Sequence, residues 1–339
     1  MARMGVPQSA SELIGVLTPI WERALQRSSI GAEENFFVLG GDPGAAGRIF
    51  TEVAQTCGCV LPPFVMYQAP TIASLAALLS QPGPPQFSPL VLLKPGTGGP
   101  PIFITHGLGG HLMEFFGLVR HMPDSQPIYG MQTRGMDGVA QPFDRIEDMA
   151  EYFREAIKKV QPHGPYSLIG YSLGGLVTLE MARGLKENGE AIGLLAMIDS
   201  YPPMEALSWG QRTRLTARLN MQQLASNIGL RHPSQKEKRG KSELLEDETA
   251  HPAMKEVREK SRLALEQYRP QFYDGKVHFV RAGIPTIFPA DPTPVWGPWL
   301  KELAVETVPG DHHGILTAHA GELASILSRY LRETRSSTG

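Results

Sequence analysis

One short stretch restricts the fold of this chain more than any other: Gly170-Tyr-Ser-Leu-Gly174, with Ser172 at its centre. An apolar run leads into Tyr171, and a second apolar pattern at helical spacing begins at Leu173, which argues against a chance match in a glycine-rich loop. Gly-x-Ser-x-Gly between a strand and a helix is typical of a sharp turn that exposes the serine hydroxyl. Its two glycines let neighbouring backbone pass without a Cβ clash. The stretch therefore predicts a strand, a strained turn and a helix, with Ser172 as a nucleophile.

The chain from Pro100 onward has the pattern of the sheet that such a turn requires. Apolar runs typical of buried strands alternate there with helical patterns. The expected strands are 102–105, 127–131, 166–171, 192–198, 276–280 and 305–308, and the clearest helices are 112–122 and 146–160. Alternation of this kind indicates a mostly parallel sheet with helices on both faces. We assign residues 100–333 to this α/β domain.

A long helical stretch interrupts the strand pattern between about 203 and 268. Apolar residues recur at helical spacing at both of its ends, whereas 235–241 is strongly charged and contains a glycine. An insertion after a central strand lies over the carboxyl ends of the strands, where open α/β sheets bind their ligands. We interpret it as a lid over Ser172, and a decorative pair of surface helices is the alternative.

The stretch 9–80 is predicted to form a separate, small all-helical unit. Apolar residues recur at helical spacing over 13–25, 48–56 and 72–79. The following stretch, 81–99, is rich in proline and glycine, which cannot extend a helix, and we interpret it as a linker. Two domains suit a length of 339 residues.

The bulk composition excludes several classes of function. Lys and Arg number 32 against 34 Asp and Glu, so no global field recruits nucleic acid or an anionic membrane. No apolar run approaches the length of a membrane span, and the N-terminus lacks the apolar core of a signal peptide. The only cysteines, Cys57 and Cys59, have no partners that would complete a metal site, so we expect reduced thiols, no metal and a cytoplasmic location.

Two further residues complete a catalytic constellation with Ser172. A serine hydroxyl becomes a nucleophile when a base removes its proton and a carboxylate holds that base in the right tautomer. Asp199 closes the strand after the serine's helix, and His312 follows the last strand. The order Ser172, Asp199, His312 is the Ser…Asp…His order of α/β-hydrolases. Asp291 stays open as an alternative acid, because in α/β-hydrolases the carboxylate often follows the strand after the one that Asp199 closes.

Three motifs in the helical unit resemble those of a known domain. They are Glu34-Asn-Phe-Phe-Val-Leu-Gly-Gly-Asp42, Leu61-Pro62 and Ala69-Pro-Thr-Ile72. Over nearly its whole length the unit is similar to the carrier domain of nonribosomal peptide synthetases. In that family the next residue after Gly-Gly-Asp is a serine that receives a phosphopantetheine arm. Here that residue is Pro43, which has no hydroxyl, and Gly44 departs from the usual bulky apolar residue. The resemblance implies a carrier-like domain of four helices with no covalently bound cofactor.

The second domain resembles the thioesterase domains that end nonribosomal peptide and polyketide synthetases, which have the α/β-hydrolase fold. The resemblance covers about 100–331. It rests on the turn Gly170-Tyr-Ser-Leu-Gly174, which we call the elbow, on the order of the serine, aspartate and histidine, on the turn Gly310-Asp-His312 and on the inserted lid. It favours Asp199 over Asp291 as the acid. It also selects His312 over the adjacent His313 as the base.

Catalysis on a carbonyl also needs donors for the negative charge that develops on its oxygen. The backbone N–H of Leu173 is one candidate, because it opens the helix after the elbow and the helix dipole adds to its effect. The other donor would come from the loop His106-Gly-Leu-Gly-Gly110, in which the resemblance implies Leu108.

The resemblance implies a release reaction. An acyl or peptidyl chain, held as a thioester on a pantetheine arm, passes to Ser172 and leaves as an acid or a ring. Because Pro43 cannot hold the arm, the substrate would come from a partner carrier, in trans or on another segment of a synthetase. Two alternatives stay open: a carboxylesterase for small esters, and a non-catalytic docking module of a synthetase assembly.

Overall fold

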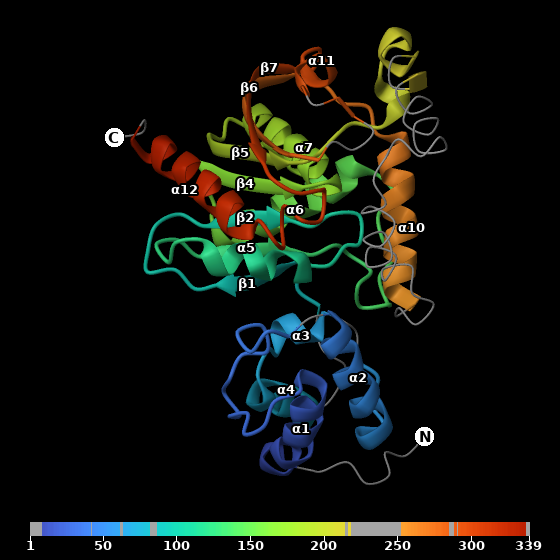
Figure 1. The fold of residues 1–339 in the computed structure, drawn as a ribbon, viewed down its shortest axis with the longest axis vertical. Helices are drawn as coiled ribbons and strands as arrows, with labels where there is room; N and C mark the ends of the chain where they lie inside the picture. The colour runs from blue at the N-terminus through green and yellow to red at the C-terminus, as the bar shows by residue number, and fades with distance from the viewer. Residues whose placement is uncertain are drawn as a thin grey trace, which may run out of the picture.

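The structure, a computed structural model, describes residues 9–41, 43–61, 64–81, 87–213, 216–217, 252–284, 288–289 and 291–336. The chain forms a helical unit and a larger unit built on a sheet, which adjoin each other (Figure 1).

The helical unit contains four helices in its described residues: α1 (Ala10–Leu25), α2 (Pro43–Cys57), the single turn α3 (Val65–Gln68) and α4 (Ile72–Ser80). Capping boxes at Ser9 and Thr71 open α1 and α4, because each side chain accepts the N–H three residues on. Trp21 is fully buried and packs edge-on against Phe36 in the centre of the bundle. The helix α2 begins at Pro43, earlier than the expected 48, which agrees with the tolerance of proline at a first helical position.

The described residues form seven strands in one sheet, in the order β1-β3-β2-β4-β5-β6-β7. The strands are β1 (Leu90–Lys94), β2 (Ile102–Thr105), β3 (Ile128–Met131), β4 (Tyr166–Tyr171), β5 (Ile192–Ile198), β6 (Tyr273–Ala282) and β7 (Leu300–Val308). All neighbours are parallel except β1, which runs antiparallel to β3. The expectation of a linker over 81–99 is wrong for Leu90–Lys94, because these residues form β1 of the sheet.

Helices cover both faces of the sheet. On one face lie α6 (Ile146–Val160) and α7 (Leu173–Glu187), and on the other lie the short η1 (Met113–Phe115), α5 (Phe116–His121) and α12 (Ala320–Ser336). The pleat of β5 makes this plain: Leu195 and Met197 join the core with α6 and α7, whereas Leu194, Ala196 and Ile198 join the core with α5 and α12. The domain is therefore an α/β-hydrolase fold, as expected.

The expected lid is described only at its two ends. Its first part contains η2 (Met204–Ala206), and its last part is α10 (Pro252–Gln267), which runs along one side of the sheet unit (Figure 1). Residues 218–251, with the charged stretch 235–241, lie outside the described residues. The short α11 (Thr293–Trp296) precedes β7. In the part of the chain that is described, no helix has the length and apolar character needed to cross a membrane.

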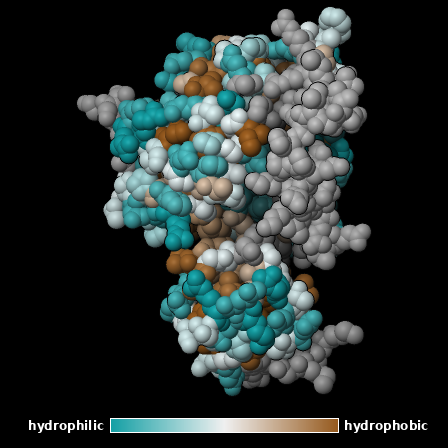
Figure 2. Space-filling view, viewed as in Figure 1, coloured by the Kyte–Doolittle hydropathy of each residue, from teal (hydrophilic) through white to brown (hydrophobic). Residues whose placement is uncertain are grey.

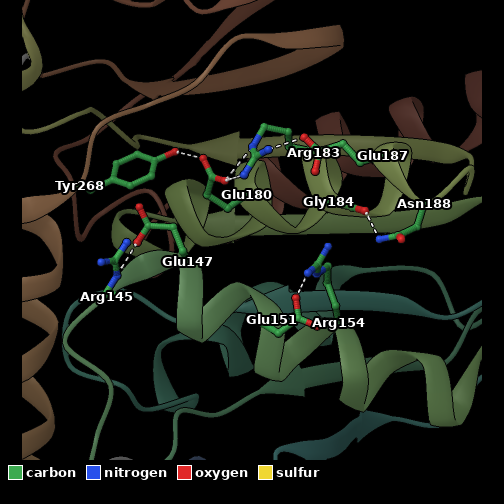
Figure 3. A network of polar contacts seen from close by, with 10 residues as sticks. All are labelled: Arg145, Glu147, Glu151, Arg154, Glu180, Arg183, Gly184, Glu187, Asn188 and Tyr268. Carbon is green, nitrogen blue, oxygen red and sulfur yellow. Dashed lines mark hydrogen bonds and ion pairs between the residues drawn. The ribbon is translucent and has the colours of Figure 1, made fainter.

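A buried polar network attaches the end of α10 to α7 (Figure 3). The Tyr268 hydroxyl, just after α10, donates to Glu180 at 2.7 Å, and the same carboxylate pairs with Arg183 at 2.8 Å. Both Tyr268 and Glu180 are buried. A buried carboxylate that has a hydroxyl and a guanidinium as partners resists separation from either. The base of the inserted segment is thus fixed to the helix that begins at the elbow.

Candidate active site

The elbow has the strained geometry that its sequence predicts. Ser172 joins β4 to α7 with φ 55° and ψ −120°, in a region that side-chain-bearing residues rarely occupy. Its N–H donates to the carbonyl of Ile198 at 2.9 Å. A Cβ added at Gly170 would lie 2.2 Å from the carbonyl oxygen of Gly174, so both motif glycines are required by close backbone packing. The hydrogen bond to β5 and the backbone contact between Gly170 and Gly174 hold Ser172 in this conformation.

Asp199 and His312 meet beside this elbow. His312 Nδ1 lies 2.7 Å from Oδ2 of Asp199, and Oδ1 of Asp199 accepts the N–H of Ala282 at 3.1 Å. Asp199 directly follows β5, has φ 46°, and is only 5% exposed, whereas His312 is half-buried. The carboxylate therefore has a fixed position from which it can orient the imidazole and select its tautomer.

Tyr171, the residue before the serine, holds His312 against the elbow. Its hydroxyl donates to the His312 carbonyl at 2.9 Å, and the two rings stack with centroids 4.8 Å apart and 25° between their planes. Among the hydrogen bonds of the described residues, none joins the Ser172 hydroxyl to His312. Catalytic hydrogen bonds often tighten only when substrate is bound. The structure thus brings the serine, the imidazole and the carboxylate to one edge of the sheet.

The other candidates for acid and base lie elsewhere. Asp291 is exposed, and its Oδ1 accepts the N–H of Thr293 at 2.9 Å, as in a turn that begins a helix. His313 is exposed and lies edge-on to His312. Neither takes part in the pairing of His312 with Asp199.

The loop after β2 lies against the start of α7. A Cβ added at Gly174 would lie 2.4 Å from the carbonyl oxygens of both Thr105 and His106, so the loop and the elbow helix are in backbone contact. Leu108 is half-buried within this loop, and Leu173 is the first residue of α7. The N–H of a first helical residue has no partner within the helix, which leaves it available to an oxygen in front of the helix.

Two features of this loop have no sequence signal. Glu114 in η1 accepts the N–H of Gly107 through Oε1 at 2.8 Å, and burial raises the pKa of this carboxyl to about 7. The His106 Nδ1 lies 2.6 Å from the Gly107 carbonyl oxygen, and burial lowers the pKa of His106 to about 4. His106 is therefore a neutral donor that shapes the loop. Both contacts depend on the turn that brings the loop back towards η1, and no sequence motif predicts that turn.

The helix α10 covers this loop from outside. A Cβ added at Gly110, which has φ +75°, would lie 2.5 Å from Cγ1 of Val257 on α10. Lys260, one turn further along, pairs with Asp144 at 3.0 Å. The last helix of the inserted segment thus packs on the loop beside Ser172.

The geometry agrees with the family to which the sequence belongs. The family model of the thioesterase domain matches residues 100–331, most of the chain. The chain belongs to the thioesterase domain family. A second family model, the phosphopantetheine attachment site, matches residues 16–79, which make up most of the helical unit that precedes the thioesterase domain.

Curated relatives are large synthetases. The chain is 38% identical over 187 residues to malpibaldin synthetase of Mortierella alpina, a match that covers 54% of this chain and 3% of that protein. It is 36% identical over 189 residues to a dimodular nonribosomal peptide synthase of Bacillus subtilis (strain 168), a match that covers 55% of this chain and 8% of that protein. The chain therefore spans only a small part of the length of these relatives.

Solved structures share the fold. A four-domain nonribosomal peptide synthetase, holo-AB3403 bound to AMP and glycine, matches 98% of this chain and 26% of its own chain, with 22% identity and a TM-score of 0.59. The NocB thioesterase domain from the nocardicin cluster matches 70% of this chain and 95% of its own, with 25% identity and a TM-score of 0.52. The first of these matches extends over both units.

Proposed function

We propose that the thioesterase domain releases an acyl or peptidyl chain from a phosphopantetheine thioester through an acyl-enzyme on Ser172. The observation that carries this proposal is the pairing of His312 with buried Asp199 at 2.7 Å, beside a serine in a strained elbow. The family match indicates thioester chemistry, and this pairing is the arrangement that activates a serine hydroxyl.

Acylation begins when the Ser172 hydroxyl attacks the thioester carbonyl carbon while His312 Nε2 takes the hydroxyl proton. The oxygen of the tetrahedral intermediate is held by the N–H groups of Leu108 and Leu173. Removing one such donor in a serine hydrolase costs about 3 to 4 kcal/mol of transition-state stabilisation. The C–S bond then breaks, and the protonated His312 returns its proton to the departing sulfur, which leaves the acyl group on Ser172.

Release repeats these steps with a different nucleophile. A water molecule gives its proton to His312 and attacks the acyl carbonyl, and the Ser172 oxygen leaves with that proton, which yields a free acid. An amine or hydroxyl at the other end of the same acyl chain can replace the water, which yields a ring. The inserted segment, about 203–268, would act as the lid that governs which nucleophile enters, and the contact between α10 and Gly110 supports this role.

The substrate is delivered by a different carrier. The attachment position is Pro43, the first residue of α2, and its ring offers no hydroxyl for a phosphodiester, so this residue does not fit the arm. We assign the delivery to a partner carrier, in trans or on another segment of a synthetase. The small share of the relatives' lengths that this chain spans leaves ample sequence for such a segment in proteins of that kind.

A release assay tests this function. A serine-bearing carrier is loaded with an acyl pantetheine thioester and mixed with the protein, and the released acid or ring is quantified. The Ser172→Ala variant should lose at least about 10³-fold in rate. A matched small oxygen ester is run in parallel, since faster turnover of that ester would indicate a carboxylesterase. Equal release with Ser172→Ala would contradict an enzymatic role for the elbow and favour a docking module.

A further inference from the structure

The carrier-like domain packs on the segment that follows the loop 106–110, which we call the oxyanion loop because it contains Leu108. Phe37 of the carrier-like domain stacks on Phe116 of α5 with 8° between the ring planes, and Tyr67 of α3 lies nearly parallel to the same ring. One continuous core cluster includes residues of both domains, and apolar surface gathers where they meet (Figure 2). Separating the domains would expose these aromatic rings to water, which is unfavourable.

Tyr67 also makes a specific polar contact across this junction. Its phenolic oxygen accepts the backbone N–H of Leu112 at 2.9 Å, and Tyr67 is only 5% exposed. Leu112 is the N-cap residue of η1, and its side chain makes no capping hydrogen bond. A buried N–H without an acceptor is unfavourable, so Tyr67 stabilises the start of η1 from the other domain.

The start of η1 is linked directly to the oxyanion loop. Glu114 is the second residue of η1, and its carboxyl accepts the N–H of Gly107. Gly107 immediately precedes Leu108, the residue to which we assign an oxyanion donor. A chain of contacts therefore connects Tyr67 to the residue before Leu108, through Leu112, Glu114 and Gly107.

We propose that the carrier-like domain, which lacks an attachment serine, serves as a fixed positioning domain for the oxyanion loop; the positioning residues are Tyr67 of this domain and Glu114 of η1. This inference rests on the proposed function, because it assigns the loop a role in that reaction. Pro43 fits this role, since a domain that carries no substrate does not need to leave its partner. Tyr67 touches no reacting atom and acts through η1.

The test compares Tyr67→Phe with Tyr166→Phe in the full chain. Tyr166 is also fully buried, and its hydroxyl donates to the carbonyl of Gln161, but it lies at the opposite end of β4 from Ser172. Both variants lose one buried hydroxyl and keep the ring. Hydrogen exchange is measured on peptides within 107–116, and kcat and KM are measured with an acyl-pantetheine thioester.

Tyr67→Phe should speed exchange at Leu112 and lower kcat about 10-fold. KM should stay unchanged, because displaced oxyanion donors affect the transition state rather than substrate binding. Tyr166→Phe should change neither the exchange nor kcat. Glu114→Ala should behave like Tyr67→Phe, and Glu114→Gln, whose amide oxygen still accepts the Gly107 N–H, should restore most of kcat. Unchanged exchange in Tyr67→Phe would overturn the docking, whatever the activity. Faster exchange with unchanged kcat would overturn the positioning role. Absence of Ser172-dependent release in the wild type would instead count against the proposed function.

Discussion

His312 Nδ1 lies 2.7 Å from Oδ2 of Asp199, although 113 positions separate the two residues in the chain. The remaining oxygen of Asp199 is held by the N–H of Ala282 in β6. This arrangement leaves Nε2 of the imidazole free to face a nucleophile and favours the tautomer that can accept a proton there.

Asp199→Asn should lower kcat by about 10³- to 10⁴-fold, because an amide in this place no longer stabilises the imidazolium or selects the tautomer. Steady-state kinetics with an acyl-pantetheine thioester checks this loss. Asp291→Asn is the matched control and should keep kcat within about twofold. A larger loss in Asp291→Asn than in Asp199→Asn would reverse the assignment of the acid.

His106 should make the protein less stable in mild acid. Burial lowers its folded-state pKa to about 4, below the unfolded value near 6.5. Between these two pH values the unfolded chain therefore binds more protons than the folded protein. The contribution of His106 is fully present above pH 6.5 and is lost as the pH falls through 4. Wild type should therefore lose about 3 kcal/mol more than His106→Asn between pH 7 and pH 4.

Urea unfolding of the two proteins at a series of pH values measures this difference. His111, whose pKa burial also lowers to about 4, is present in both proteins, so the effect of its burial is common to the two curves. Parallel stability curves for wild type and His106→Asn would show that His106 is not held neutral.

Gly174→Ala should destabilise the fold, because the new Cβ would lie 2.4 Å from two backbone carbonyl oxygens that cannot move aside independently. We expect a loss of at least about 2 kcal/mol in the free energy of unfolding. Gly15→Ala makes the same chemical change within α1, at an exposed site with no atom within 4 Å, and should stabilise by about 0.5 to 1 kcal/mol. Thermal unfolding of both variants compares the two signs, and equal shifts would contradict the close packing at the elbow.

Pro43 predicts that the protein resists loading. Incubation with a phosphopantetheinyl transferase and coenzyme A should leave its intact mass unchanged, while a serine-bearing carrier in the same tube gains the arm. Pro43→Ser need not restore loading, since Gly44 also departs from the pattern of carrier domains. A gain in mass by the wild-type chain would mean that another residue accepts the arm.

The parts of the site that the sequence could predict are those fixed by local pattern. The elbow around Ser172 has its own strand, turn and helix signals. Asp199 directly follows β5, and His312 lies in the turn after β7. The sequence does not predict β1, because it is a short edge strand between proline-rich segments, with β3 as its one neighbour in the sheet. No periodicity distinguishes it from a linker.

Contacts made through tertiary structure alone could not be predicted. Glu114 reaches Gly107 only because the loop after β2 turns back on itself, and a lone glutamate has no motif. From the sequence, Tyr67 is indistinguishable from an ordinary core residue of a small helical bundle. Its hydrogen-bond partner, Leu112, lies 45 positions away in the other domain. Both belong to the link between the carrier-like domain and the oxyanion loop, and only the assembled chain reveals it.

The most direct measurement of the central claim is the mass of the peptide that contains Ser172 after rapid mixing with an acyl-pantetheine thioester and acid quenching. The account predicts that this peptide gains one acyl group in the wild type, and that the gain disappears in Ser172→Ala together with release of product. An acyl group found on a different residue, or product released at the wild-type rate by Ser172→Ala, would contradict it.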